Sequence, residues 1–196
     1  HTLVFTWAEA SAFRFLASAR AEDGLDKHFA TLIAVAAALT LGVITVSATA
    51  ITLAGLDAET AGIIAFSICA AVLRFIVRLA RESDRAALHF TRYAALEAAY
   101  LVVGFAAGVA FLVIFDFGAA APFAGALAAG VVVVLFDAPF WVAAGKSGVA
   151  STQTALRYAS YGAPLALALT VDLAVQSAAR WLLASQAGNA ALGAYA

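Results

Sequence analysis

Three acidic residues lie inside long apolar stretches of the sequence, where ionisable side chains are rare. Glu97 lies in the stretch 92–117, Asp137 in the stretch 123–144 and Asp172 in the stretch 156–183. A charged side chain at membrane depth costs at least about 2.5–3.5 kcal/mol on insertion scales, so each acid needs a counter-charge, a proton or water. Such residues are typical of proton and cation pathways, and also of hydrogen bonds to a neighbouring helix or subunit.

Asp137 and Asp172 are the stronger candidates for a proton or cation site. Asp137 precedes Pro139 by two residues, and a proline inside a helix leaves a backbone carbonyl without its usual donor. The pair therefore indicates an irregular, hydrated point in the helix. Asp172 is the deepest of the three acids, because it lies well inside its stretch and far from Arg157 at the start.

Glu97 and three threonines complete the predicted pathway residues. Glu97 lies near the start of its stretch and close to Arg92, which predicts an ion pair at the membrane surface. The spacing of Thr45, Thr49 and Thr52 places them on one face of a helix. Two interpretations of the threonines stay open. Their hydroxyls bond preceding carbonyls or a neighbouring helix, or they line a hydrated pathway.

Four arginines, spaced three or four residues apart, extend the second apolar stretch into a charged one. A ridge of cations at the end of a membrane-spanning helix attracts anionic lipid headgroups. The sequence therefore predicts lipid or partner binding by Arg74, Arg78, Arg81 and Arg85. Simple anchoring of the helix end by charge is the alternative.

Small residues are frequent in the apolar stretches, and Gly104 and Gly108 form a GxxxG pair. Helices in lipid associate through close backbone approach, which small residues permit. We predict that this pair packs against another helix. That helix belongs to the same bundle or to a partner subunit.

The composition indicates a membrane protein. The chain of 196 residues is 65% hydrophobic and 12% charged, whereas soluble domains are about 45–50% apolar and about 25% charged. A transmembrane helix needs about 20 apolar residues. Five stretches meet this requirement, at 28–56, 60–79, 92–117, 123–144 and 156–183. Gly55 is expected to end the first, and the run 151–154 to cap the last. We therefore expect an all-α, polytopic transmembrane helical bundle over residues 28–185.

The two ends of the chain are predicted to differ from this bundle. Residues 1–20 mix aromatic and charged side chains, so residues 1–27 are predicted to form an interfacial amphipathic helix and a polar linker. The alternative is that they are the end of a further membrane span. Residues 186–196 are small and polar and predict a flexible tail.

Positive charge is concentrated on one side of the predicted spans. Arg180 falls on the other side, and the remaining Lys and Arg fall together: Arg14, Arg20, Lys27, Arg74, Arg78, Arg81, Arg85, Arg92, Lys146 and Arg157. By the positive-inside rule, this places the N-terminus on the cytoplasmic or matrix side. The membrane is predicted to be a bacterial or archaeal plasma membrane or an organellar inner membrane. Trimming or import processing would account for the start at His1.

Several function classes are disfavoured by the sequence. It contains one cysteine, Cys69, so an intrachain disulfide or a thiolate zinc site cannot form. No phosphate-binding loop, zinc-protease motif, nucleophile elbow or dinucleotide fingerprint is present. No basic–aromatic module favours nucleic acid. We therefore expect a protein that is not an enzyme and that uses no cofactor or metal.

The intramembrane carboxylates favour a transport- or channel-type protein that translocates protons or cations. The alternative is a non-catalytic structural subunit of a larger membrane complex, such as an energy-converting one. A membrane sensor domain is third. The predicted partners are the lipid bilayer with its anionic lipids, and either other membrane subunits or further copies of the chain.

Overall fold

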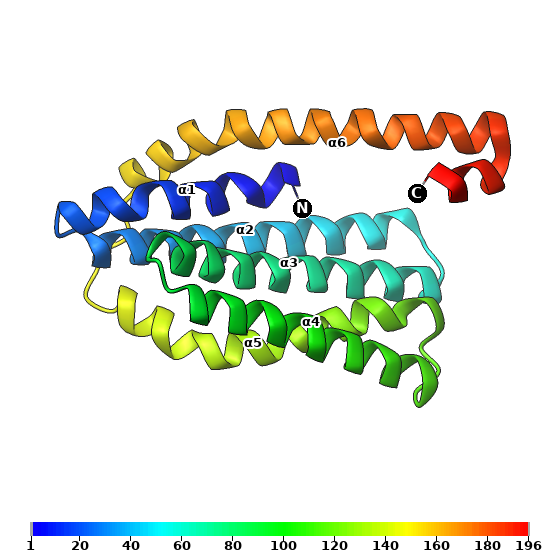
Figure 1. Cartoon of the computed structure of the whole chain (residues 1–196), viewed down its shortest axis with the longest axis horizontal. Coiled ribbons are helices and arrows are strands. Elements are labelled where there is room, and N and C mark those ends of the chain that lie inside the picture. The colour runs from blue at the N-terminus through cyan, green and yellow to red at the C-terminus, as the bar shows by residue number, and fades with distance from the viewer. Residues whose placement is uncertain (1, 196) are drawn as a thin grey trace.

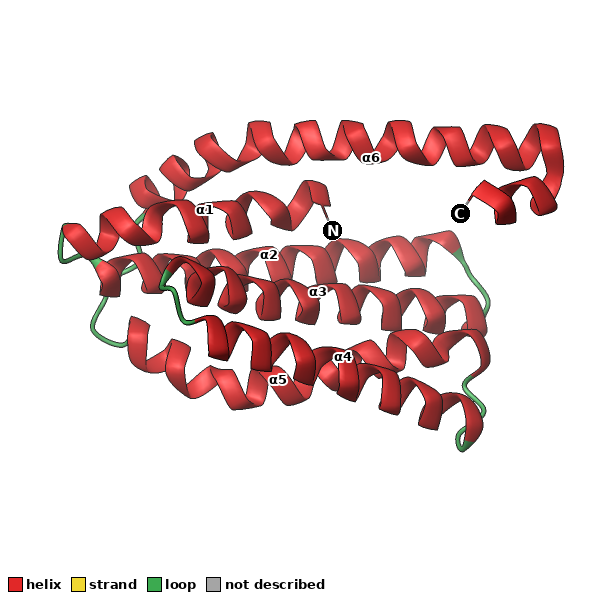
Figure 2. Ribbon diagram, in the orientation of Figure 1, coloured by secondary structure: helices red, strands yellow, loops and turns green. Residues whose placement is uncertain are grey.

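The computed structural model describes the backbone of residues 2–195 and the side chains of residues 2–178, 181 and 182. Within that range the regular structure is helical (Figure 2), and strands are not found. The helices are α1 (Thr2–Ala21), α2 (Leu25–Ala54), α3 (Ala58–Ala86), α4 (Phe90–Val113), the short 3-10 helix η1 (Gly118–Ala120), α5 (Ala121–Gly145) and α6 (Thr152–Tyr195).

Five of these helices are long and apolar enough to cross a membrane. They correspond to the five predicted stretches and comprise Leu25–Ala54, Ala58–Ala86, Phe90–Val113, Gly118–Gly145 and Thr152–Ala178. The structure therefore confirms the predicted all-α transmembrane bundle. The helices run through Pro139 and Pro164 without interruption.

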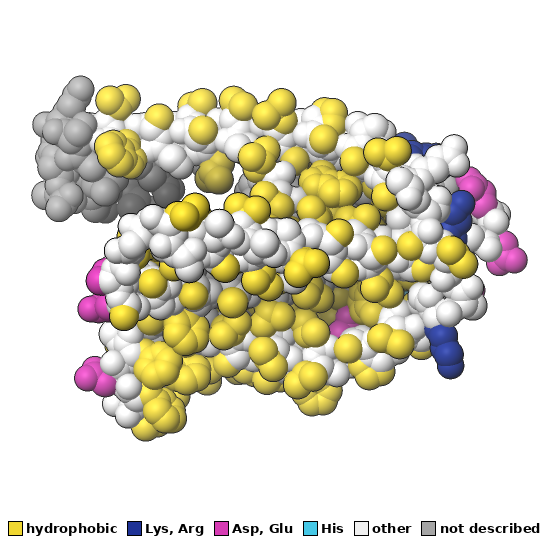
Figure 3. Space-filling view, turned by 180° about the vertical axis from the view of Figure 1, so that it is seen from behind, with side chains coloured by type: hydrophobic (Ala, Val, Ile, Leu, Met, Phe, Trp, Pro, Cys, Tyr) yellow, Lys and Arg dark blue, Asp and Glu magenta, His cyan; other side chains and the backbone are white. Residues whose placement is uncertain are grey.

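The helices run antiparallel to their sequence neighbours, so their connections gather at two ends of the bundle (Figure 1). We call one the basic end; it holds the connections α1–α2, α3–α4 and α5–α6. Lys and Arg side chains gather there, whereas acidic side chains are visible at both ends (Figure 3). The side chain of Arg180, the exception in the sequence, lies outside the described residues. The charge asymmetry of the sequence is thus a property of the folded bundle.

Helix α1 forms as predicted, and one of its faces packs against the other helices. It runs alongside the other helices (Figure 1) and contacts α6, α3 and α2. Its face of Phe5, Ala8, Ala12 and Leu16 is buried. Side chains spaced three or four residues apart form one stripe of a helix, and here that stripe is covered by protein. The helix therefore packs against the bundle through this face, and its position at a membrane interface stays a prediction.

The core has two parts, on either side of α3. One joins α1, α2, α3 and α6 and includes Phe5, Leu32, Phe75 and Tyr158; the rings of Phe5 and Phe75 stack with centroids 4.4 Å apart. The other joins α3, α4 and α5 and includes Val77, Tyr100, Ala129 and Val133. Helix α3 contributes to both and is the central element of the bundle.

Helices α4 and α5 form the most extensive helix pair. A Cβ atom on Gly125 of α5 would lie 2.5 Å from the carbonyl oxygen of Gly104 and 2.6 Å from Cα of Gly108. Backbone therefore meets backbone at this crossing. The GxxxG pair packs against a helix of the same chain.

The connection between α5 and α6 is held against the first turns of α2. The Ser147 hydroxyl donates to the Asp26 carboxylate, and the Ser151 amide donates to Oγ1 of Thr31 at 3.1 Å. A Cβ atom on Gly148 would overlap the backbone carbonyl of Asp26. The connection therefore lies directly against the start of α2 at this point of the basic end.

Helix α6 is only partly attached to the bundle. It packs on α1 and, less extensively, on α2. Tyr158, Gly162 and Ala166 are buried, but from Leu167 to Ala178 the side chains are exposed apart from the half-buried Thr170. The α6 backbone continues to Tyr195, through the segment 186–196 predicted as a flexible tail. The side chains of that segment lie outside the described residues.

Candidate functional site

The main polar cluster inside the bundle is centred on Arg92 at the start of α4. Its Nε lies 3.3 Å from Oδ2 of Asp84 on α3, and its Nη2 contacts Oδ1 of Asp137 on α5. The guanidinium also lies over the ring of Phe140, 3.9 Å from the centroid. Nδ1 of His89 lies 3.5 Å from Oδ1 of Asp84. We call Asp84, His89, Arg92 and Asp137 the Arg92 network.

Local structure brings these four residues together from three helices. Val77, Ala80 and Asp84 share the buried side of α3, since residues spaced by three, four or seven positions lie on one helical face. The chain then reverses through Leu88, which has a positive φ of 62°. This turn leads into the first turn of α4, so Arg92 folds back beside the end of α3.

The charges within the Arg92 network do not balance. Asp84 and Asp137 are 3% and 5% exposed, and one guanidinium lies between them. Counting the acids as ionised, the three groups carry a net charge of minus one. A protonated His89 would neutralise it, and the His89 side chain is half-exposed at the bundle surface. The network thus joins a surface histidine to two buried carboxylates.

An apolar cavity of about 300 Å³ lies beside the network, between α2, α3 and α5. Its lining is almost entirely aliphatic, with Trp141 on one side, and Asp137 and Thr40 contribute the polar groups. Oδ2 of Asp137 and Oγ1 of Thr40 are buried without a described hydrogen-bond partner. Figure 3 shows acidic atoms in a recess among apolar side chains. Ile33 and Val142 on the rim are exposed, so the cavity opens toward the side of the bundle.

Two arginines of the predicted α3 ridge form ion pairs with acids of other helices. Arg81 pairs with Glu97 of α4, and Nε of Arg78 lies 3.4 Å from Oε2 of Glu9. Glu97 therefore pairs across helices with Arg81, not with the sequence-near Arg92.

The two outer arginines of the ridge also contact groups of this chain. The Arg74 guanidinium lies 5.2 Å from the ring centroid of Tyr100, and that of Arg85 lies 4.5 Å from the ring of Phe13. Binding of lipid or a partner by this ridge stays a prediction.

The structure does not join Asp172 to Asp137. Asp172 is exposed on α6 and accepts a hydrogen bond from Nε2 of Gln176 at 2.8 Å. Helix α5, which carries Asp137, has no more than a marginal contact with α6 among the described residues. The two acids are therefore separate features.

The threonine stripe lies on the exposed outer half of α2. The hydroxyl of Thr49 donates to the carbonyl of Thr45 at 2.9 Å, and that of Thr52 to the carbonyl of Thr49 at 2.8 Å. Each bond stays within the helix. Of the predicted pathway residues, the structure thus brings Asp137 alone into the Arg92 network.

Sequence reasoning missed Asp84, His89 and Glu9 as members of buried ion pairs. Asp84 lies in a charged segment that resembles a solvated helix end. The apolar periodicity of α3 could have predicted that Asp84 is buried. Phe75, Leu79 and Ser83 are buried and continue the buried side into the charged segment.

Among the described residues, no group of three His, Cys, Asp or Glu side chains is placed to hold a metal ion. The helical fold and the exposed apolar surface define the class: the chain is a multi-pass integral membrane protein. Comparison with protein families, with curated proteins and with solved structures found no match.

Proposed function

We propose that the protein is a transport- or channel-type membrane protein that takes up a proton or cation at the Arg92 network. The observation that carries this proposal is the sharing of one guanidinium by two buried carboxylates, Asp84 and Asp137. A buried excess charge is unfavourable unless it is neutralised. Binding of a proton or a cation removes this excess charge.

The position of the network supports uptake from the basic end. His89 is half-exposed and lies beside Asp84, whereas Asp137 reaches the α2–α3–α5 cavity. Histidine exchanges protons near neutral pH. His89 therefore brings a proton donor or acceptor within reach of Asp84, and Arg92, which stays charged, couples the charge of Asp84 to that of Asp137 beside the cavity. Intramembrane carboxylates that line a cavity are typical of proton relays and ion sites.

The test is proton or cation flux in liposomes that contain the full chain. We expect Asp84→Asn and Asp137→Asn to reduce flux at least about tenfold, because each removes an ionisable carboxyl from the network. Asp172→Asn is the matched control and is expected to retain flux. Infrared difference spectra recorded across a pH titration should lose one carboxyl band in Asp137→Asn.

Two results would contradict the proposal. One is wild-type flux no greater than that of empty liposomes, together with infrared spectra that show no carboxyl titration. The other is flux that is unchanged in both Asp84→Asn and Asp137→Asn. Circular dichroism and gel filtration of each variant separate loss of function from loss of fold.

A second function, as a structural subunit of a membrane complex, is favoured by a different observation. Asp172 and Gln176 form a polar pair on an exposed, otherwise apolar face of α6. A polar pair facing lipid is unfavourable, and side chains of this kind hydrogen-bond across helices in membranes. A neighbouring subunit on α6 would supply the missing partner groups.

Copurification from native membranes tests this second function. We expect a partner chain to be lost when Asp172 and Gln176 are both replaced by Leu, and retained when Thr49 on α2 is replaced by Val. A wild-type chain that purifies alone and monomeric under mild extraction would argue against it.

A further inference from the structure

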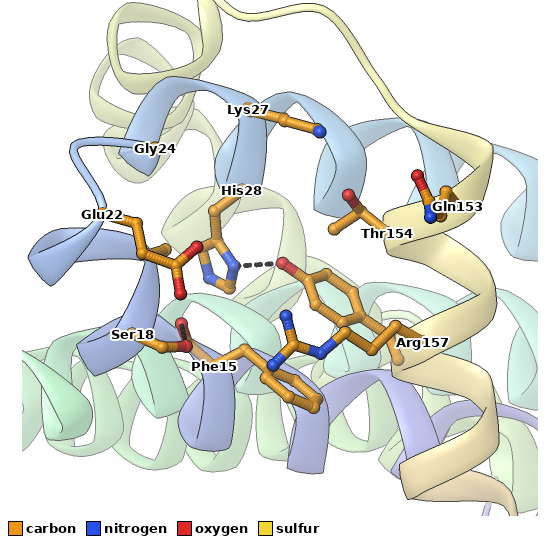
Figure 4. A pocket seen from close by; sticks show the side chains of 11 residues that line it. Phe15, Ser18, Glu22, Gly24, Lys27, His28, Gln153, Thr154 and Arg157 are labelled. Atoms are coloured by element: carbon orange, nitrogen blue, oxygen red, sulfur yellow. Dashed lines mark hydrogen bonds between the residues drawn. The ribbon is translucent and has the colours of Figure 1, made fainter.

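A second cavity, of about 400 Å³, lies at the basic end where α1 ends and α2 and α6 begin. It shares no residue with the Arg92 network, and polar and charged side chains line it together with Phe15 and Ala19. Lys27 and Arg157 bring two cations to it, Ser18 and Thr154 bring hydroxyls, and Glu22 is its acidic residue. Figure 4 shows these side chains around the cavity.

His28 is the buried polar residue of this cavity. It is 1% exposed, and its Nδ1 lies 2.5 Å from the hydroxyl oxygen of Tyr158. Its Nε2 is buried and has no hydrogen-bond partner among the described residues. When the Tyr158 hydroxyl donates to Nδ1, Nε2 carries the ring proton and is a donor without an acceptor. Buried donors are rarely left in that state, because an unmade hydrogen bond is costly.

The helix starts at the cavity add further donors. Gly24 precedes α2 and has no side chain to accept from the amides of its first turn. The first amides of a helix lack partners within the helix, and they carry partial positive charge that attracts anions. At the start of α6, by contrast, Oγ of Ser151 accepts from the amide of Thr154 at 3.3 Å. The α2 start is therefore the one with amides left uncapped by a side chain.

Arg157 is an exposed side chain that lies over an aromatic ring at the edge of the cavity. Its guanidinium lies over the ring of Phe15, 4.9 Å from the centroid, and an aromatic face orients a guanidinium without using its N–H donors. Those donors match the oxygens of a phosphate in a paired geometry.

We propose that this cavity binds a phosphate group, with Arg157, Lys27 and Nε2 of His28 as its donors. The cavity lies at the basic end, which attracts anionic lipid, and its size also admits a free phosphate. The chemistry is the same for both sources. The proposal does not depend on the proposed transport function, because none of its residues belongs to the Arg92 network.

The test measures binding to the full-length chain in two arms. In the first, inorganic phosphate is titrated into protein in neutral detergent, and thermal stability is recorded. In the second, nanodiscs of phosphatidylcholine with and without phosphatidic acid are compared, and retained lipid is counted by native mass spectrometry. Stabilisation in the first arm identifies free phosphate, and specific retention in the second identifies a lipid headgroup. Either result supports the site.

Variants locate the binding in this cavity. We expect Arg157→Gln and His28→Gln each to weaken binding about tenfold, the size of a lost hydrogen bond to a charged group. Arg157→Lys should recover part of it. Arg14→Gln is the charge-matched control, because Arg14 is an exposed arginine that does not line the cavity. The proposal is wrong if neither probe binds the wild type. It is also wrong if Arg14→Gln weakens binding as much as Arg157→Gln.

Discussion

Polar side chains make different contacts in the two halves of the bundle, the half near the basic end (the basic half) and the opposite half. Near the basic end, polar groups on different helices bond one another: Arg92 joins Asp84 to Asp137, and His28 meets Tyr158. In the opposite half, polar groups bond within their own helix, as Thr49 does. Polar groups therefore hold helices together in one half and leave them independent in the other.

This difference separates the two proposed sites from the rest of the bundle. Cavities with unpartnered polar atoms lie in the basic half, where helices converge and α1 fills the space between α3 and α6. In the opposite half, α6 is exposed and carries Asp172 outward. The first half is suited to binding small molecules or ions, and the second to lipid or a neighbouring helix.

The largest loss of stability is expected on removal of Arg92, the cation that lies between two buried carboxylates in the basic half. Arg92→Gln leaves Asp84 and Asp137 buried without a counter-charge, and loss of one member of a buried ion pair costs about 3–5 kcal/mol. Because the Arg92 side chain is partly exposed, we expect a loss of about 3 kcal/mol. Unfolding in mixed micelles measures it. Adding Asp84→Asn and Asp137→Asn should restore most of the stability, and no recovery would show that charge is not the cause.

A smaller loss is expected at the α4–α5 crossing, which spans both halves. Gly125→Ala places a methyl group against the backbone of Gly104 and Gly108, where no side chain can move aside. Overpacking of this kind costs about 1–3 kcal/mol. Gly42→Ala is the control, since no atom lies within 4 Å of its added Cβ, and alanine favours a helix by up to about 1 kcal/mol. If Gly125→Ala and Gly42→Ala are equally stable, the close backbone contact between α4 and α5 is contradicted.

A local effect is expected at the opposite end, where Asp57 caps α3. Hydrogen bonds from Thr60, through its side chain and its amide, hold the pKa of Asp57 below its ordinary value. The cap is therefore present above the ordinary carboxyl pKa and is lost as the pH falls through the lowered value. Hydrogen exchange should show the Thr60 amide losing protection in acid. Asp57→Ala should show that loss at every pH, and acid-insensitive protection in the wild type would count against the cap.

The smallest effect is expected at the threonine stripe. Thr49→Val removes a hydroxyl that bonds its own helix and faces outward, so stability should change by no more than about 0.5 kcal/mol. Micelle unfolding measures this as well. A loss comparable to that of Gly125→Ala would show that the stripe contacts something in the folded protein, and the two halves would then be more alike than the structure indicates.

The fold could be predicted because lipid imposes strong rules on a sequence. Apolar length alone located the five long helices, and the positive side chains fixed which connections share an end. Helix ends could also be predicted. Helix α2 ends at Gly55, whose φ is 59°, and Ser151 caps α6. These features depend on residues close together in the chain.

The candidate site was only partly predictable, because its partners come from distant segments. Asp137 was recognisable as an acid at membrane depth, but nothing near it identifies Asp84 or Arg92 as its neighbours. Glu97 illustrates the same limit. The arginine nearest in sequence suggested itself as a partner, whereas Arg81 on the preceding helix is the one in contact. Pairing across helices depends on rotation about each helix axis, which apolar length does not specify.

The close contact of Gly148 with the carbonyl of Asp26 makes the connection between α5 and α6 rigid against α2. With Ser147 and Ser151 also bonded to α2, the first turns of α2 and α6 form one stiff joint. Beyond that joint, the side chains of α6 from Leu167 to Ala178 are exposed apart from the half-buried Thr170. A sideways load on the far part of α6 would then be transmitted through Tyr158 near the start of α6 to His28, which it contacts on α2.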